Sequence, residues 1–189
     1  MNAFNRFTMS NIEIVLRNGG KIDLKTWQQR YGLPLLSTKI GRHFSYTETR
    51  FARDIQRYGK LVVNELLMIV LDEYRERIAE PVHINSFNRD QAKQDELAEQ
   101  GFRTAKFSPH VFCIAADVDT KDEVDTREKA LTMLRVGRDL GIKIRVGFEQ
   151  YIRANQSFIH VDVCPEYFAP GEPWHHIAHP KQWETTLSW

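Results

Sequence analysis

The chain has 189 residues, of which 42% are hydrophobic and 27% charged, a composition typical of one globular domain and unlike a disordered or fibrous protein. Its 26 basic and 25 acidic residues give a formal net charge of +1, which argues against a protein that mainly grips nucleic acid or an anionic membrane. Two cysteines are too few for a disulfide framework or a cysteine-built zinc finger, so a metal site must use histidines and carboxylates. No apolar stretch approaches the length of a membrane-spanning helix.

The first half of the chain is predicted to be mainly helical. Residues 1–42 contain Gly-Gly and Gly-Leu-Pro turns and predict an N-terminal extension with one short helix at 24–31. Residues 45–48 form a Ser-to-Glu capping box, which predicts that a helix starts there. Apolar side chains recur every three or four residues within 60–79, which predicts a longer amphipathic helix ending before Pro81.

The second half of the chain is predicted to alternate strands with helices. Segments in which apolar and polar residues alternate, or which are continuously apolar, predict the strands, and a glycine follows each predicted helix. This order of elements predicts an α+β fold in which helices pack on a small, mostly antiparallel sheet. The predicted strands are 81–86, 111–118, 142–147 and 158–163, and the predicted helices are 91–100 and 124–140.

Two short segments combine histidine with aspartate in a way that suits metal binding. His110 and Asp117 are seven positions apart. That separation is about 23 Å in a straight strand, whereas ligands of one metal ion lie about 2 Å from it, so the chain must bend if the two share an ion. His160 and Asp162 project from the same face of a predicted strand. Such a pair suits either a metal ligand with an orienting carboxylate or an acid–base pair.

These segments resemble the motifs of a known enzyme family. The pattern Ser-x-His-x-x-x-x-Ala-x-Asp at 108–117, followed by Phe-Ile-His-Val-Asp-Val at 158–163, is similar to that of zinc D-alanyl-D-alanine carboxypeptidases and murein endopeptidases. The wider group includes lysostaphin-type enzymes and hedgehog domains. The similarity covers residues 43–165 and includes Ser-Phe-Asn-Arg at 86–89, which resembles the family's Ser-Gly-Tyr-Arg element.

The resemblance implies a zinc site and a peptidase activity. His110, Asp117 and His160 would be the protein ligands of zinc, and three ligands leave a fourth position for water, as in catalytic zinc sites. Arg89 matches the arginine that binds substrate in these enzymes, since a guanidinium can hold a carboxylate or carbonyl. Ser108 would support the substrate or the turn. The implied fold is hedgehog-like, with the zinc site on the sheet.

The sequence departs from the family pattern in three places. Cys113 stands where the family has glycine, so a thiol must fit where backbone was close, or adds a soft atom near the metal. Phe87 and Asn88 occupy the middle of the Ser-Gly-Tyr-Arg element. The family's general base, two or three residues before the last ligand, is replaced by Phe158 and Ser157, which cannot act as bases.

Three other carboxylates are candidates for the missing general base. Asp162 is the nearest by strand geometry, although it equally suits a role that only orients a ligand. Glu149 is the second choice. Glu172 belongs to a Glu-Pro-Trp-His segment that resembles the dipeptidase branch of the family, and in that arrangement His175 would replace His160 as the third ligand. A rigid strand positions a ligand better than a proline-rich segment, which favours His160.

We therefore expect a zinc-dependent peptidase that hydrolyses stem peptides or cross-links of peptidoglycan, with no nucleic-acid partner and no membrane insertion. Its catalytic domain is expected at 43–165, between the extension 1–42 and a tail at 166–189. The N-terminus lacks a recognisable signal peptide, so we expect synthesis in the cytoplasm and action at the cell wall, as a phage lysis or virion enzyme or after export by another route. The alternative is a zinc-binding domain without hydrolysis, which binds cell-wall peptide or has a structural role in a virion.

Overall fold

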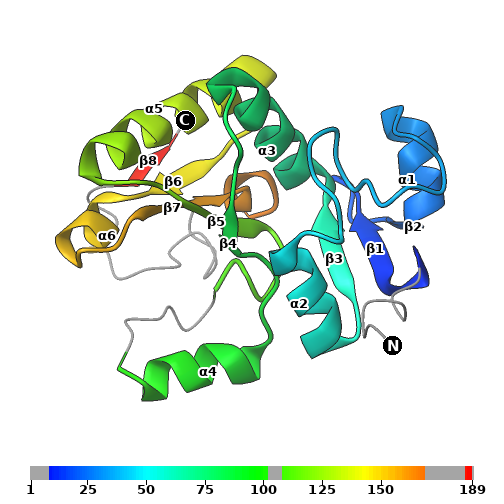
Figure 1. The fold of residues 1–189 in the computed structure, drawn as a ribbon, viewed down its shortest axis with the longest axis horizontal. Coiled ribbons are helices and arrows are strands. Elements are labelled where there is room, and N and C mark those ends of the chain that lie inside the picture. The colour runs from blue at the N-terminus through cyan, green and yellow to red at the C-terminus, as the bar shows by residue number, and fades with distance from the viewer. Residues whose placement is uncertain (1–8, 102–107, 169–185, 189) are drawn as a thin grey trace.

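The computed structural model describes residues 9–101, 108–168 and 186–188, which form an α+β fold with two small sheets and six α-helices (Figure 1). The sheets have the strand orders β2-β1-β3 and β4-β5-β7-β6-β8. The strands are β1 (Ile12–Val15), β2 (Lys21–Asp23), β3 (Leu61–Asn64), β4 (Ile84–Ser86), β5 (Ala115–Asp119), β6 (Arg145–Gly147), β7 (Phe158–Asp162) and β8 (Thr186–Ser188). The helices are α1 (Leu24–Tyr31), α2 (Thr49–Tyr58), α3 (Glu65–Ile78), α4 (Gln91–Glu99), α5 (Glu123–Leu140) and α6 (Glu149–Arg153).

The five-stranded sheet is antiparallel at each of its pairings, which confirms the predicted small, mostly antiparallel sheet. Helices α3 and α5 lie on one side of this sheet and α4 lies on the other (Figure 1). Ile159 and Val161 of β7 belong to the hydrophobic core together with Met133 of α5. Because side chains alternate along a strand, His160 and Asp162 project from the opposite face of the sheet. This face carries the candidate site.

The N-terminal residues belong to the same hydrophobic core as the rest of the fold. Strand β1 pairs with β3 in parallel, so the predicted boundary at residue 42 falls within a unit whose strands share one sheet. Ile14 and Trp27 are buried in one core cluster with Phe51 and Leu67. The Trp27 indole N–H also donates to the carbonyl of Ile40 at 2.9 Å. The described part of residues 1–42 therefore packs as an integral layer of the fold.

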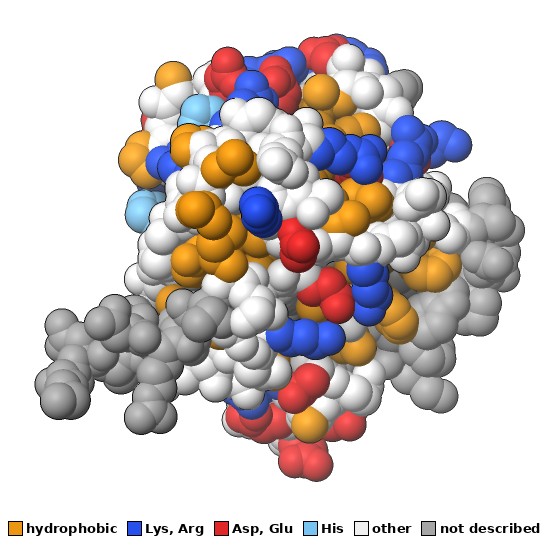
Figure 2. All heavy atoms as spheres, turned by 90° about the vertical axis from the view of Figure 1, so that its right-hand side faces the viewer, with side chains coloured by type: hydrophobic (Ala, Val, Ile, Leu, Met, Phe, Trp, Pro, Cys, Tyr) orange, Lys and Arg blue, Asp and Glu red, His pale blue; other side chains and the backbone are white. Residues whose placement is uncertain are grey.

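The surface around this N-terminal sheet carries both signs of charge. On the face of the molecule that includes the sheet, basic and acidic side chains are interspersed, with hydrophobic side chains between them (Figure 2). This mixture agrees with the near-neutral charge of the chain. No helix in the described ranges is long and apolar enough to cross a membrane.

The prediction of a helix at 60–79 was wrong for its first five residues, which form the strand β3 and the residue before it. Val62 and Val63 are β-branched and fit a strand, and pairing with β1 satisfies the backbone of β3. The helix α3 starts only after Asn64, whose side-chain oxygen accepts the Leu67 N–H at 3.1 Å as a cap. The helical periodicity was therefore read correctly, but the local cap that ends the strand was missed.

The helix predicted to start at residues 45–48 begins four residues later, at Thr49. The Glu48 side chain accepts the Ser45 N–H at 2.9 Å, as in a capping box, but the Glu48 N–H also bonds to the Ser45 carbonyl at 3.0 Å and closes a turn. Ser45 is held extended by a bridge to Lys39. The motif therefore stabilises the turn before the helix. The helices α1, α4 and α5 match their predictions within one residue, while β4, β6 and β7 are shorter than predicted.

Candidate metal centre

Two adjacent strands and one turn bring the three predicted metal ligands together. Asp117 in β5 lies directly opposite His160 in β7 in the antiparallel register. His110 lies in a turn before β5, so the strand predicted at 111–118 starts only at Ala115. Within this turn the Cys113 N–H bonds to the His110 carbonyl at 3.1 Å. The turn supplies the bend that two ligands seven residues apart require.

Cys113 adopts a positive φ of 58°, a conformation that favours glycine. This is the position at which the resembled motif has glycine, and the turn geometry explains that preference. Burial raises the pKa of the Cys113 thiol to about 11, so it is a neutral thiol at pH 7. Ser108 is buried and its carbonyl accepts the Val111 N–H at 2.9 Å, which gives Ser108 a place in the same turn.

The three candidate ligands form a compact, buried group. One donor atom from each of His110, Asp117 and His160 lies within 4.8 Å of the other two. The Asp117 Oδ1 atom is 3.2 Å from His110 Nε2 and 2.8 Å from His160 Nδ1. Two imidazole nitrogens and a carboxylate oxygen suit a divalent transition metal, and donors this close can share an ion at about 2 Å. The residues therefore fit a metal ion of unspecified identity.

The charges in the metal-free group are strongly coupled. Burial raises the pKa of the Asp117 carboxyl, but His110 and His160 outweigh it and hold that pKa well below its usual range. Burial also opposes charge on His160, yet its hydrogen bonds to Asp117 and Asp162 raise its pKa to about 9. Burial lowers the pKa of His110, more than the attraction of Asp117 raises it. Without a metal ion, His160 is thus the protonated histidine of the pair.

Asp162 lies beside His160, as the strand spacing predicted, but it faces a second partner as well. Its side chain has 0% exposure, and its Oδ2 atom is 3.3 Å from His160 Nε2. Arg145 in β6 donates to Asp162 through Nε at 3.0 Å, and its Nη2 atom forms an ion pair with Asp162 Oδ2 at 2.9 Å. Despite burial, the charge of Arg145 holds the pKa of Asp162 well below its usual range.

Arg89 lies at the edge of the group, close to Asp117. Its Nη2 atom is 3.9 Å from Asp117 Oδ2, and its backbone N–H bonds to the His110 carbonyl at 3.2 Å. The guanidinium donates to the Ser86 hydroxyl at 2.9 Å and to the Gln94 side-chain carbonyl at 2.8 Å. The predicted substrate-binding arginine is therefore oriented beside the candidate ligands.

The other candidate bases have different positions. Glu149 pairs with Arg127 of α5. Helix α5 packs against β6 and β7, so Glu149 is engaged by a cation of that helix. Glu172 and His175 lie outside the residues that the structure describes, so the alternative site that uses them is not placed.

Sequence reasoning missed three residues of this region: Arg145, Gln94 and Tyr151. The ring of Tyr151 packs on Phe158 with centroids 4.0 Å apart, and Phe158 shares the face of β7 that carries His160. Burial, followed by the nearby charge of Asp117, raises the pKa of Tyr151, so its phenol is neutral. A tyrosine eleven positions from Asp162 carries no sequence signal for this contact.

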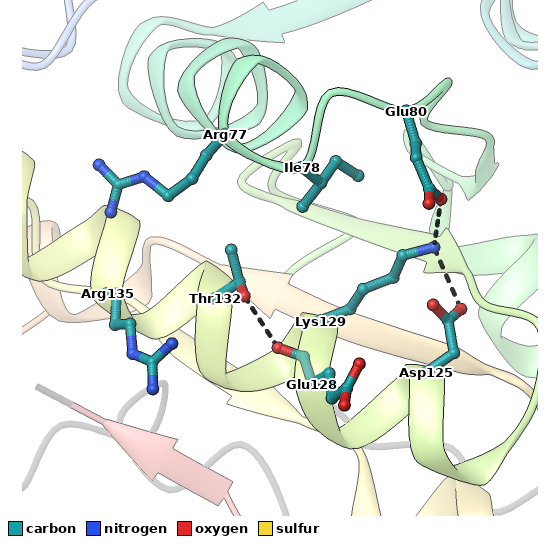
Figure 3. A pocket seen from close by; sticks show the side chains of 8 residues that line it. All are labelled: Arg77, Ile78, Glu80, Asp125, Glu128, Lys129, Thr132 and Arg135. Atoms are coloured by element: carbon teal, nitrogen blue, oxygen red, sulfur yellow. Dashed lines mark hydrogen bonds and ion pairs between the residues drawn. The ribbon is translucent and has the colours of Figure 1, made fainter.

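A polar hollow between the end of α3 and the outer side of α5 is separate from the metal centre, because none of the three ligands lines it (Figure 3). Lys129 points toward Glu80 and Asp125 and pairs with them at 3.4 and 3.1 Å. Arg77 on its other side pairs with Asp139 at 2.6 Å. Carboxylates of the protein thus balance these cations, and we assign the hollow no ligand.

Comparison of the chain with models of known families, with curated proteins and with solved structures finds no match in any of the three. The geometry of the site and the sequence motifs therefore carry the functional argument.

Proposed function

We propose that the protein is a zinc-dependent peptidase that acts on the stem peptides or cross-links of peptidoglycan. The observation that carries the proposal is the buried group of His110, Asp117 and His160 with Arg89 beside it. A group of two histidines and one aspartate is a donor set typical of catalytic zinc, whose fourth position is taken by water. The proposal includes the finer fold assignment, a hedgehog-like domain with zinc on its sheet.

The three ligands would hold zinc at the face of the sheet formed by β5 and β7. When bound in such a site, zinc supplies a Lewis acid that polarises a carbonyl and lowers the pKa of water to about 7. The protein's own contribution is to keep the ligands buried and fixed, since Asp117 and His160 lie on paired strands and His110 on a hydrogen-bonded turn. Rigid elements hold catalytic groups more accurately than loops.

Arg89 is the group that we assign to substrate binding. Bonds to Ser86 and Gln94 use two of its five N–H groups and fix the orientation of the guanidinium. The remaining N–H groups can donate to a carboxylate or a peptide carbonyl of the substrate. Arg89 lies 3.9 Å from Asp117, so a substrate carboxylate bound to it would lie near an ion held by Asp117, which supports cleavage near a charged peptide end.

A second candidate function is a zinc-binding domain that holds cell-wall peptide or has a structural role without hydrolysis. One observation favours it: Asp162, the carboxylate nearest to the ligands after Asp117, is engaged by Arg145 and His160. A carboxylate bound in this way is poorly placed to accept a proton from water. Binding of muropeptide with no product would support this second function.

The deciding experiment measures muropeptide release from purified peptidoglycan. We expect the zinc-loaded protein to release products, a chelator to abolish release, and added zinc to restore it. His110→Ala should be inactive, whereas His83→Ala, which alters an exposed histidine before β4, should keep full activity. Arg89→Lys loses paired hydrogen bonds and should lower kcat/KM by about 10- to 100-fold. Full activity of His110→Ala, or of the wild type without metal, would overturn the proposal.

A further inference from the structure

We infer that Asp162 and Arg145 form a positioning pair that makes His160 bind the metal ion through Nδ1, whereas His110 binds it through Nε2. The inference rests on the metal site of the proposed function but not on hydrolysis. The test detects directly which nitrogen atoms bind the metal. The inference can therefore fail while the peptidase proposal stands, and the peptidase proposal can fail while the inference stands.

The ligand atom of His110 follows from the partner of its other ring nitrogen. His110 Nδ1 lies 2.7 Å from the carbonyl oxygen of Phe87, which can only accept a hydrogen bond. The proton of the neutral imidazole therefore resides on Nδ1, and Nε2 carries the free lone pair. That Nε2 atom is the one that faces Asp117, at 3.2 Å.

His160 has the opposite arrangement. Its Nε2 atom lies 3.3 Å from Asp162 Oδ2, while its Nδ1 atom faces the shared Asp117 oxygen at 2.8 Å. An ionised carboxylate can only accept a hydrogen bond, so the ring nitrogen beside it must carry a proton. Asp162 therefore keeps the single proton of the neutral His160 imidazole on Nε2. The lone pair then points from Nδ1 toward Asp117 and the metal position. A carboxylate on the far nitrogen also raises the basicity of a ligating histidine.

Arg145 is required because Asp162 is completely buried. A buried carboxylate without water is costly unless it is paired and hydrogen-bonded, so Asp162 needs a fixed partner of opposite charge to hold its place beside His160. Arg145 contacts both carboxylate oxygens, at 3.0 and 3.1 Å from Nε, and the Cys164 N–H donates to Oδ1 at 2.9 Å. Arg145 and Asp162 are also direct partners in the register of β6 and β7, so both ends of the pair are fixed by the sheet.

This arrangement makes Asp162 a positioning residue and not the general base. Its carboxylate contacts the ring nitrogen of His160 that faces away from Asp117. A base for the attacking water must instead lie within hydrogen-bond reach of the open metal position. The same contact explains the spacing His-x-Asp in β7, because positions two apart are neighbours on one face of a strand.

The direct test is nitrogen-15 NMR of histidine-labelled protein loaded with cadmium, whose one-bond couplings identify the ligating nitrogens. We expect coupling to Nδ1 of His160 and to Nε2 of His110. Coupling through Nε2 of both histidines would overturn the inference. This measurement uses the wild-type side chains, so it holds even where a variant does not fold.

Zinc affinity of variants, measured by competition with a chelator, tests the positioning role. Asp162→Asn should bind zinc about 10- to 100-fold more weakly, because the amide neither compensates Arg145 nor raises the basicity of His160. Asp72→Asn is the matched control, since Asp72 is an equally buried carboxylate that accepts the N–H groups of Arg42 and His43. The control should bind zinc like the wild type. Wild-type zinc affinity in Asp162→Asn, with or without loss of hydrolysis, would refute the positioning role.

Discussion

Metal binding to this site should release one proton per ion at neutral pH. In the metal-free protein His160 has a pKa of about 9, so it is protonated at pH 7 and donates to both Asp117 and Asp162. A metal ion must displace the proton on Nδ1, because that atom faces Asp117. The lowered pKa of Asp117 means that this carboxyl is already ionised, and the lowered pKa of His110 means that this imidazole is already neutral. Neither residue therefore releases a second proton when the metal binds.

The magnitude follows from the difference between pH and pKa. Each pH unit below the pKa of His160 divides the deprotonated fraction, which binds the metal, by about ten, so apparent affinity should fall about tenfold per pH unit from pH 8.5 to 6.5. With a pKa of about 9, the affinity at pH 7 should be about 100-fold below that of the fully deprotonated site. Lower pH weakens binding because the proton and the metal compete for the same lone pair.

Isothermal titration in buffers of different ionisation enthalpy counts the released protons, and chelator competition at several pH values gives the slope. We expect one proton and a slope of one. A pH-independent affinity would mean that His160 is neutral in the metal-free protein or does not bind the ion. Release of two protons at pH 6, where water on zinc with a pKa of about 7 keeps its proton, would mean that His110 is also charged in the metal-free protein.

Three further predictions concern stability and catalysis. Cys113 has a positive φ, so in urea denaturation Cys113→Gly should be more stable than Cys113→Ala by about 1 kcal/mol; equal stability of the two variants would refute the strain. The folded-state pKa of His160 is raised above its unfolded value, so its stabilising contribution is fully present below about pH 6.5 and is lost as the pH rises through about 9. Metal-free protein should therefore lose about 3 kcal/mol over that range, and a flat profile in chelator would contradict the coupling. Tyr151→Phe should reduce kcat by about tenfold without changing zinc content, because only the phenol hydroxyl is removed beside the site; an unchanged kcat would exclude the hydroxyl from the reaction.

Local signals in the sequence were sufficient for several helices. Helix α5 begins at the cap formed by Asp122 and ends at Gly141 in the left-handed conformation, and both signals lie within a few residues of the ends. The boundary between β3 and α3 was not found, because the apolar residues of both elements form one continuous run. Pairing with β1, nearly fifty residues away, decides that Leu61–Asn64 is a strand.

The candidate site was predictable where spacing alone determines which side chains meet. His160 and Asp162 share a face because of strand alternation, and the separation of His110 from Asp117 required a bend that the turn supplies. Arg145 was not predictable, since its contact with Asp162 depends on which residues of β6 and β7 stand opposite each other. Register is set by the whole sheet and not by either segment alone.

The most direct test of the account is the metal content of the purified protein after equilibration with zinc. We predict one zinc ion per chain in the wild type, and loss of that ion in His110→Ala and in Asp117→Ala, each of which removes one donor of the buried group. His83→Ala should retain one ion, as the control. Zinc bound at wild-type stoichiometry and affinity in both ligand variants would contradict the assignment of the metal centre.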